Sequence, residues 1–331
     1  MTRFRSLFVA MAAAVVAGHV AGAAAQQTTP LKFTLDWRFE GPGALFLLPA
    51  AKGYFKAEGL DVTIDSGAGS AGAVTRIATG GYDMGFADLA ALIEFLAANP
   101  SNKTQAVFIV YDTAPAAIFT LKKNGIAKPQ DLAGKNIGAP PFDAARKAWP
   151  IFAKAVGLKT DAVTWQNMDP ALREQLLVRG EVPAISGFYF TGYLNLIARG
   201  AKPDEIVAFK YGDYGVKLYG NAVMVGEKFA AANPKAVAGF LRALKKGMEE
   251  VVANPDAAIA HVKARDGLID EKLETQRLKL MIADQLAKGG KFTGAVDPAQ
   301  LAKNIADVVE AFGLKGKPAP ETVFNASFLP K

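Results

Sequence analysis

The chain has 331 residues, of which 51% are hydrophobic and 21% are charged, so it can bury a large core in one large or two medium domains. It contains no cysteine, which excludes disulfides, thiolate metal sites, cysteine nucleophiles and the lipid-bearing cysteine of bacterial lipoproteins. The net charge of +7 is scattered without basic runs, which argues against nucleic acid as a partner, and the ordinary composition excludes a disordered or fibrous chain.

Residues 1–25 have the pattern of a secretory signal peptide. Arg3 and Arg5 form a basic start, an apolar run follows at 7–17, and small residues up to Ala25 form a cleavage site. The apolar run is shorter than the roughly 20 residues that a membrane span needs. We therefore expect export to the periplasm with cleavage near Ala25, which leaves 36 of the 38 basic side chains against 31 acidic ones.

Predicted strands and helices alternate from residue 31 onwards, which indicates an α/β fold with mostly parallel sheets. In a first block we expect strands at 31–35, 60–64, 83–86, 107–111 and 118–121, and helices at 44–57, 71–79 and 89–98. In a second block we expect strands at 136–138, 163–165, 182–186 and 206–209, and helices at 143–156, 170–179 and 189–198. Residues 80–88 and 180–188 both contain a glycine, a short strand and a small loop in that order. This similarity predicts two lobes of related design.

A last strand at 222–225 leads into a helix-rich tail. Its helices are expected at 234–252, 255–264, 271–287 and 298–311, and most of them open at a proline. Because the tail adds no further strand, we expect it to pack on the first lobe. The predicted organisation is a signal peptide (1–25), a first lobe in two parts (26–121 and 216–331) and a second lobe (122–215), joined by a hinge of two crossings near 120–123 and 211–220.

A G-x-G-x-x-G motif occupies residues 67–72, between a predicted strand and a predicted helix. It follows the second strand rather than the first, and the next suitable acid, Asp88, ends a strand of another unit, so a dinucleotide site is not favoured. The motif is still suited to ligand binding. Gly69 lets a ligand come close to the backbone, and the free N–H groups of the helix start after Ser70 favour an anion. A plain glycine-rich turn is the alternative.

Asp36, Trp37 and Arg38 follow the first predicted strand, where open α/β sheets place their ligands. Trp37 offers a flat face for stacking, and Arg38 offers a planar fork for a carboxylate, sulfonate or phosphate. The alternatives are a core position for Trp37 and an ion pair between Arg38 and Glu40. Since no base or metal ligand accompanies Asp36 and Glu40, binding is favoured over catalysis.

Similar corners between strand and helix occur in the second block. Phe142 precedes Asp143, which is expected to cap the next helix, and Ser186 and Tyr189 mark the following corner, for which a simple turn is the alternative. His261 is expected on a charged helix surface. No G-x-S-x-G, H-E-x-x-H or G-K-[S/T] motif occurs, so we expect no hydrolase, zinc-protease or nucleotidase chemistry, no cofactor and no metal.

Several segments resemble, in the same order, the substrate-binding proteins of ABC importers. They are Leu35 to Trp37, residues 51–62, the glycine-rich loop, residues 80–85 and residues 129–138. The subgroup is the one that takes thiamine pyrimidine precursors, taurine and other sulfonates, and nitrate. The resemblance implies a two-lobed periplasmic binding protein of type II, a monomer that closes on its ligand and partners an importer permease in the inner membrane.

The resemblance implies ligand contacts at the strand ends of both lobes. Carried over position by position, these are Asp36, Trp37, Gly69, Ser70, Ala87 and Asp88 in the first lobe and Phe142 and Ser186 in the second. Arg38 and Tyr189, read from their own chemistry, complete the predicted site. Pro183, and an insert at 38–42, depart from the family pattern, so the resemblance does not identify the ligand.

The residues favour a small organic anion, such as an aromatic carboxylate or sulfonate, because Arg38 and the helix start after Ser70 would bind its charge. The alternative is an aminopyrimidine whose amino group is held by Asp36 or Asp88. A fungal pyrimidine synthase on the same fold is a further relative of this family, but it depends on histidine and cysteine residues. We therefore expect a binding protein rather than an enzyme.

Overall fold

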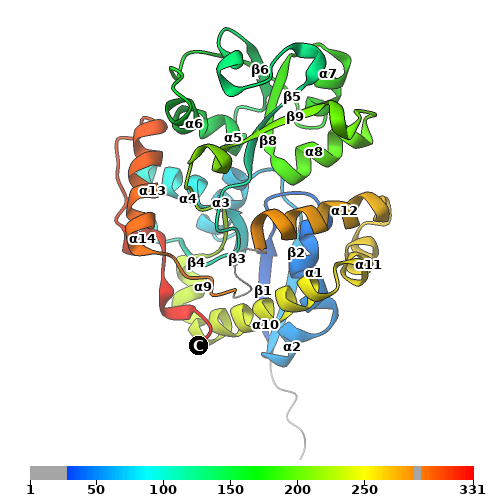
Figure 1. Ribbon diagram of the computed structural model, residues 1–331. Coiled ribbons are helices and arrows are strands. Elements are labelled where there is room, and N and C mark those ends of the chain that lie inside the picture. The colour runs from blue at the N-terminus through cyan, green and yellow to red at the C-terminus, as the bar shows by residue number, and fades with distance from the viewer. Residues whose placement is uncertain (1–27, 287–291) are drawn as a thin grey trace, which may run out of the picture.

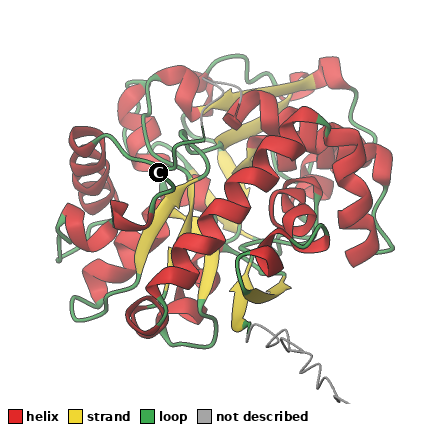
Figure 2. Ribbon diagram, turned by 90° about the horizontal axis from the view of Figure 1, so that it is seen from below, coloured by secondary structure: helices red, strands yellow, loops and turns green. Residues whose placement is uncertain are grey.

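The computed structural model describes residues 28–286 and 292–331. The predicted signal peptide at 1–25 and the last residue of the helix expected at 271–287 lie outside these ranges. The described chain forms two lobes, one above the other in Figure 1, and each is built on a five-stranded sheet with helices packed around it (Figures 1 and 2). None of the described helices combines the length and hydrophobicity that a bilayer crossing requires.

The sheet of the first lobe has the strand order β2-β1-β3-β10-β4. Its strands are β1 (Thr29–Thr34), β2 (Leu60–Asp65), β3 (Met84–Asp88), β4 (Gln105–Ile109) and β10 (Asn221–Val225). The strands β1, β2 and β3 are parallel, whereas β10 runs antiparallel between β3 and β4. Every residue of β3 and β10 is buried, as expected for central strands covered by helices on both faces.

The sheet of the second lobe repeats this arrangement with the order β7-β6-β8-β5-β9. Its strands are β5 (Ala116–Leu121), β6 (Asn136–Ala139), β7 (Thr164–Asn167), β8 (Ala184–Phe188) and β9 (Ile206–Lys210). The strands β3 and β8 hold the same place in their sheets, and each runs directly into a helix. The predicted correspondence between residues 80–88 and 180–188 is therefore confirmed.

The strand β5 lies in the second lobe, whereas the sequence assigned residues 118–121 to the first. It pairs antiparallel with β8 and β9, so the first crossing between the lobes lies at 110–115 rather than at 120–123. All six of its residues are buried and apolar or small, so the local sequence does not indicate which sheet it joins. The second crossing, at 211–220, lies where the sequence placed it.

Most predicted helices are present with small shifts of their ends. In the first lobe the helices are α1 (Ala44–Ala51), α2 (Tyr54–Ala57), α3 (Ser70–Ala78) and α4 (Leu89–Ala98), and in the second α5 (Ala144–Lys147), α6 (Trp149–Ala155), α7 (Arg173–Arg179) and α8 (Tyr189–Ala198). The helix expected at 44–57 is divided because Gly53 adopts a left-handed conformation with a φ of 74°. The helix expected at 143–156 is divided at Ala148, ahead of Pro150.

The tail consists of α9 (Glu227–Ala232), α10 (Pro234–Ala253), α11 (Pro255–Arg265), α12 (Glu271–Met281), α13 (Pro298–Ala311) and α14 (Pro320–Val323). As predicted, it packs on the first lobe: α10 and α11 cover α1, and Phe240 stacks on Phe33 with ring centroids 5.0 Å apart. In addition, α12 contacts α8 and α13 contacts α6, so the tail also touches the second lobe (Figure 1).

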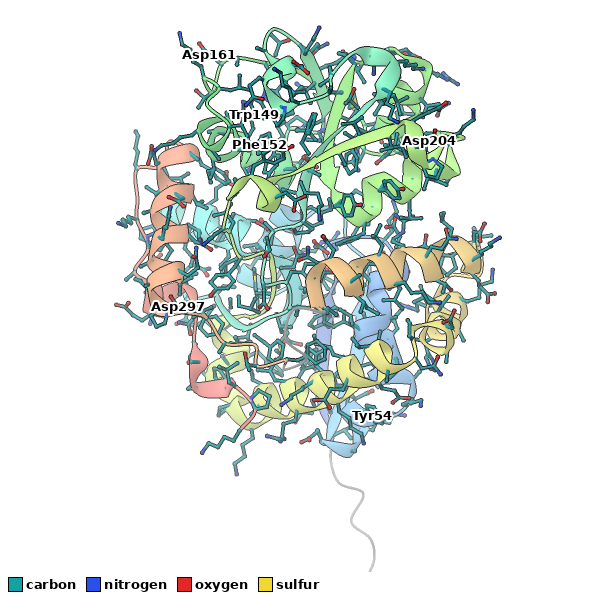
Figure 3. All side chains as sticks on the ribbon, viewed as in Figure 1. Tyr54, Trp149, Phe152, Asp161, Asp204 and Asp297 are labelled. Atoms are coloured by element: carbon teal, nitrogen blue, oxygen red, sulfur yellow. The ribbon has the colours of Figure 1, made fainter. Side chains whose placement is uncertain are left out.

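The core of the second lobe contains large aromatic side chains of α6. Trp149 and Phe152, labelled in Figure 3, are both at most 1% exposed. Phe152 stacks on Tyr211 of the second crossing, with ring centroids 4.2 Å apart. This stacking anchors the second crossing to the second lobe.

Candidate ligand-binding cavity

A cavity of about 110 Å³ lies between the two lobes. Its first-lobe wall comes from the segment after β1, the start of α3 and the end of β3, and its second-lobe wall comes from the segments around α5, α7 and the start of α8. Aromatic side chains form much of the lining: Trp37, Phe46, Phe86, Tyr111, Phe142, Phe188, Phe190 and Phe312. Aromatic side chains of this kind offer flat faces on which a planar ligand can stack.

The floor of the cavity is a buried polar cluster at the strand ends of the first lobe. Asp36 Oδ2 accepts hydrogen bonds from Ser70 Oγ at 2.9 Å and from Asn221 Nδ2 at 2.7 Å. Ser70 Oγ in turn accepts from the backbone N–H of Asp88 at 3.1 Å. Asn221 joins the cluster because β10 runs antiparallel to β3, which places Asn221 opposite Asp88.

The glycine-rich loop fits closely against the end of the first strand. The N–H of Gly69 donates to the backbone oxygen of Asp36 at 2.6 Å. A Cβ at Gly67 would lie 2.2 Å from the backbone oxygen of Leu35, so no side chain fits there. The loop therefore holds Ser70 against Asp36 and opens α3 at the cavity.

Both carboxyl groups of the floor bind protons more tightly than usual. Burial raises the pKa of Asp36 to about 6, although the hydrogen bonds from Asn221 and Ser70 oppose the shift. Burial raises the pKa of Asp88 to about 7; the N–H groups at the start of α4 oppose this shift and the nearby Asp36 adds to it. The floor therefore presents carboxyl oxygens whose burial is unfavourable. Hydrogen bonds from the N–H or O–H groups of a ligand would offset this cost.

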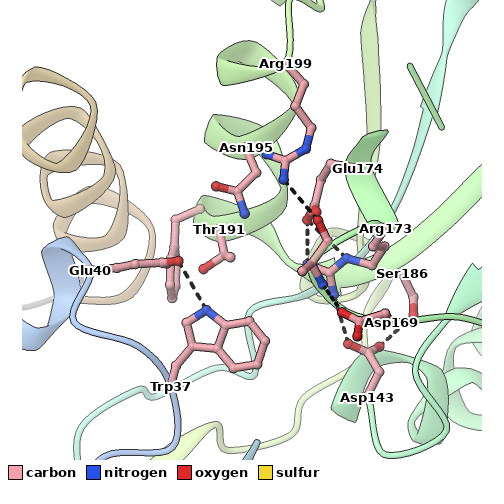
Figure 4. Close-up of polar contacts among 12 residues, drawn as sticks. Trp37, Glu40, Asp143, Asp169, Arg173, Glu174, Ser186, Thr191, Asn195 and Arg199 are labelled. Carbon is pink, nitrogen blue, oxygen red and sulfur yellow. Dashed lines mark hydrogen bonds and ion pairs between the residues drawn. The ribbon is translucent and has the colours of Figure 1, made fainter. Parts of the chain in front are cut away.

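Trp37 forms a side wall of the cavity, and its indole N–H donates to Glu40 Oε1 at 3.2 Å (Figure 4). Neither alternative drawn from the sequence holds, because Trp37 is only half-buried and Glu40 pairs with Arg277 at 3.5 Å rather than with Arg38. The Arg38 side chain is exposed at the cavity edge, with its guanidinium carbon 5.7 Å from the centre of the Trp37 ring.

The second-lobe wall contains a second buried network, also drawn in Figure 4. Arg173 donates to Glu174 Oε1 at 2.6 and 3.0 Å and to Asp143 Oδ2 at 3.3 Å. Ser186 Oγ donates to Asp143 Oδ1 at 2.6 Å, and Asp143 caps α5 as predicted by accepting from the N–H of Arg146. The network fixes the carboxylate of Asp143 at the cavity and leaves the Arg173 charge neutralised within its own lobe.

Most of the positive charge at the cavity is already paired with protein carboxylates. Of the three cationic side chains in the lining, Arg173 is held by Glu174, and Lys147 bonds Glu94 across the cleft at 2.6 Å. Only Arg38, at the edge, has no carboxylate partner among the ion pairs of the described residues. Carboxylates are more numerous in the lining: Asp36, Glu40, Asp88, Glu94 and Asp143. Within 28–286 and 292–331, no three His, Asp or Glu side chains are grouped to hold a metal ion.

The structure brings most of the predicted site residues to one cavity. The cavity is lined by Asp36, Trp37, Arg38, Gly69, Ser70, Asp88 and Phe142. Ala87 does not line it, because alternation along β3 turns its side chain away from the face of Asp88. Ser186 lies behind the wall, where it holds Asp143, and Tyr189 lies on another face of α8, stacked on Phe119.

Sequence reasoning missed several residues that line the cavity. Phe86 lies two residues before Asp88, so strand alternation was a signal that could have found it. Tyr111 and Phe190 meet across the cleft with ring centroids 5.9 Å apart, and Asn221 comes from a strand 185 residues after Asp36. No local pattern indicates those three.

Comparison with known proteins gives matches over most of the chain. A family model described as NMT1/THI5 like matches residues 44–258. The riboflavin-binding protein RibY of Chloroflexus aurantiacus is 28% identical over 217 residues, which are 65% of this chain and 60%, less than two thirds, of that relative. The formylaminopyrimidine-binding protein of Halalkalibacterium halodurans is 24% identical over 266 residues, which are 78% of this chain and 79% of that relative.

The fold is also found among solved structures. The alkanesulfonate-binding protein SsuA of Xanthomonas axonopodis pv. citri, bound to MOPS, matches with a TM-score of 0.68 at 16% identity, over 91% of this chain and 99% of that one. At this identity the likeness concerns the fold alone. It confirms the two-lobed periplasmic-binding-protein fold that the resemblance implied.

Proposed function

The chain belongs to the NMT1/THI5-like family, and on this premise we propose that it is an exported solute-binding protein that delivers a small ligand to an ABC importer. The fold supports this proposal, since such proteins close two lobes around a ligand about a hinge. The cavity between the lobes has aromatic walls and a floor of polar side chains, a combination that orients a small ligand. Delivery to a permease in the inner membrane, by a monomer, is part of the proposal.

The ligand we favour is an aminopyrimidine, which the sequence left as the alternative. The observation that carries this choice is the floor of the cavity, where the carboxyl groups of Asp36 and Asp88 lie beside aromatic walls. Such a floor accepts hydrogen bonds from a ring amino group, and Trp37 offers a face for stacking. An organic anion finds less support, because Arg173 and Lys147 are paired with Glu174 and Glu94.

One observation favours a carboxylate or sulfonate as the second candidate. Arg38 lies at the edge of the cavity beside Trp37, and its guanidinium is exposed. It could therefore bind a ligand whose charged group projects out of the cavity while its ring enters. Replacing Arg38 by alanine distinguishes the two candidates.

A thermal-shift screen tests the ligand class. The probes are 4-amino-5-hydroxymethyl-2-methylpyrimidine, formylaminopyrimidine, riboflavin, benzoate, benzenesulfonate and taurine. A binding ligand stabilises the folded state by about 2.7 kcal/mol at a hundredfold excess over Kd, which raises the melting temperature. We expect the two pyrimidines to do so. If only the carboxylate or sulfonates do, the aminopyrimidine assignment is wrong.

The Arg38→Ala variant then measures the role of this charge. An arginine that forms a charge-assisted bond to an anion contributes about 1.5 to 3 kcal/mol of binding free energy, whereas a solvated arginine contributes under about 1 kcal/mol. We expect the second, smaller effect on pyrimidine affinity. If Arg38→Ala instead lost about 1.5 to 3 kcal/mol of binding free energy for benzenesulfonate, the site would be assigned to anions.

Catalysis is not part of the proposal. The sequence has no cysteine and only one histidine, His261, after the predicted signal peptide, so the residues that the resemblance implies for a synthase are not all present. His261 lies in α11 and not among the residues that line the cavity. Export has its own test: N-terminal sequencing of the secreted protein should start near Gln26, and recovery of intact Met1 in a membrane fraction would contradict it.

A further inference from the structure

Arg277 of α12 is a buried arginine that bonds both lobes at once. Its side chain is 1% exposed. On its own side it donates to Glu274 at 2.9 and 3.1 Å and lies 3.5 Å from Glu40. Across the cleft it donates to the backbone oxygens of Phe190 at 3.3 Å and Thr191 at 3.0 Å and to Asn195 Oδ1 at 2.9 Å, all on α8.

Arg277 is also connected to the wall of the cavity. Glu40, its partner, accepts the indole N–H of Trp37, and the N–H of Gly41 donates to Glu274 at 2.6 Å. A Cβ at Gly41 would lie 2.4 Å from the backbone oxygen of Glu274, so the segment after Trp37 packs directly on α12. A continuous set of contacts therefore runs from Trp37 through Glu40 and Arg277 to α8.

The side chains of the ion pairs between the lobes are more exposed than Arg277. They are 31% and 14% exposed in the pair of Lys210 and Asp284, 28% and 32% in that of Lys147 and Glu94, and 75% and 71% in that of Lys154 and Glu310. Solvated pairs contribute little to stability, whereas a buried guanidinium that loses its acceptors is costly. Among the described residues, Arg277 is therefore the most deeply buried charged side chain that bonds across the cleft.

We propose that Arg277 is a positioning residue that couples the ligand at Trp37 to closure of the lobes, an inference that rests on the proposed binding by closure. Opening the cleft moves α8 away and removes the three second-lobe acceptors of Arg277. The first-lobe partners, Glu40 and Glu274, stay with it. A ligand that stacks on Trp37 holds Glu40 in place and so keeps the guanidinium aimed at α8.

The test measures the lobe separation with and without saturating 4-amino-5-hydroxymethyl-2-methylpyrimidine. Because the chain has no native cysteine, Lys56→Cys and Asp161→Cys provide one exposed labelling site on each lobe for distance measurement by pulsed electron paramagnetic resonance. Arg277→Lys keeps the charge but loses the planar fork that reaches Glu274 and α8 together. We expect the ratio of open to closed molecules to rise by roughly tenfold or more, as for the loss of one charge-assisted hydrogen bond.

Two further variants make the result specific. Asn195→Ala removes one acceptor on α8 and leaves the contacts of Arg277 with Glu274 and Glu40 intact, so it should shift the distances in the same direction by less. Arg242→Lys is the control, because Arg242 donates to both carboxylate oxygens of Glu58 in its own lobe and neither residue lines the cavity. We expect it to leave the lobe distances unchanged.

The proposal is overturned if, with the pyrimidine bound, Arg277→Lys and Asn195→Ala both leave the distance distribution of the wild type, or if Arg242→Lys shifts it as much. Should Arg277→Lys not fold, the Asn195→Ala result decides. Titration calorimetry on each labelled protein shows whether the pyrimidine is bound, which separates a failure of the ligand assignment from a failure of the coupling. If the pyrimidine does not bind, the distances are measured with the probe that the thermal-shift screen identifies.

Discussion

At the scale of single residues, the floor of the cavity concentrates buried negative charge. Asp36 and Asp88 are 9% and 3% exposed and share Ser70 as a hydrogen-bonding neighbour. Neighbouring polar groups donate hydrogen bonds to these carboxyl groups, but among the described residues no cationic side chain forms an ion pair with either. Burial is therefore the largest influence on both pKa values. Buried carboxyl groups of this kind lower the stability of the free protein, and a ligand that donates hydrogen bonds to them offsets part of this loss.

The first prediction concerns the pH dependence of stability. In the folded protein Asp36 keeps its proton up to about pH 6, whereas an unfolded aspartate loses it near its ordinary pKa of 3.8. The folded state therefore binds more protons at Asp36 in this window, so the stabilising contribution of Asp36 is fully present below pH 4 and is lost as the pH rises to about 6. The raised pKa corresponds to roughly 3 kcal/mol.

Asp36→Asn removes this titration and can still accept the bonds from Ser70 and Asn221. We expect the variant to match the wild type near pH 4 and to be more stable near pH 7.5, by up to roughly 3 kcal/mol. Urea unfolding at both pH values measures the difference. Parallel pH profiles of the two proteins would show that Asp36 titrates normally.

The second prediction concerns the stacking face. Trp37→Ala should weaken binding of 4-amino-5-hydroxymethyl-2-methylpyrimidine by about 1 to 3 kcal/mol, the range found when an aromatic partner of a base is removed. Trp37→Phe is the comparison variant, because it keeps a ring for stacking but loses the N–H bond to Glu40, so it should lose less affinity than Trp37→Ala. Titration calorimetry measures both. Affinity of Trp37→Ala within twofold of the wild type would rule out stacking on Trp37.

At the scale of elements, the start of α3 shows why the glycine-rich loop contains glycine. Gly69 has a φ of 126°, which side chains rarely tolerate, and a Cβ there would lie 3.1 Å from the ring of Phe142 in the other lobe. The glycines of this loop therefore allow the two lobes to pack closely and position Ser70 beside Asp36. The helix α12 similarly contacts elements of both lobes.

The third prediction follows from this geometry. Gly69→Ala should lower the free energy of unfolding by about 1 to 3 kcal/mol through backbone strain, and it should hinder closure where its methyl group meets Phe142. Adding Phe142→Ala should restore closure but not stability, because the strain remains. Denaturant unfolding and pyrimidine affinity measure the two effects separately.

Gly72→Ala is the matched control on the same helix. No heavy atom lies within 4 Å of a Cβ built at Gly72, and its φ is not positive. Alanine should therefore raise the stability by roughly 0.5 to 1 kcal/mol. Equal losses for Gly69→Ala and Gly72→Ala would contradict the special role of Gly69.

At the scale of the whole molecule, two lobes with the same strand order are joined by crossings at 110–115 and 211–220. Two covalent crossings allow the lobes to rotate while their cores stay intact, and the contacts of α12 and α13 with α8 and α6 must change when they do. The cavity between the lobes exists only while these contacts hold.

The fourth prediction is that ligand reduces the dimensions of the protein in solution. Small-angle scattering with saturating 4-amino-5-hydroxymethyl-2-methylpyrimidine should give a smaller radius of gyration than the free protein, because binding favours the closed state. Calorimetry on the same sample shows whether the pyrimidine is bound. An unchanged radius with bound ligand would argue against a mobile hinge, though not against binding.

The features that could be predicted from the amino-acid sequence are those that depend on neighbouring residues. Apolar periodicity and proline starts predicted 189–198 and 298–311 with the bounds that α8 and α13 have. Polar residues directly after a predicted strand pointed to Asp36 and Trp37, because the carboxyl ends of parallel strands form one edge. These signals act within about ten residues, so they do not need the tertiary structure.

The contacts between segments far apart in the chain, by contrast, follow from the packing of the folded protein. The strand β5 joined the second sheet through pairing with β8 and β9, and Asn221 reached Asp36 through the antiparallel pairing of β10 with β3. Arg277 meets Thr191 from 86 residues away. Such contacts form because buried polar groups must find partners wherever the packed core places them, and no local pattern carries that information.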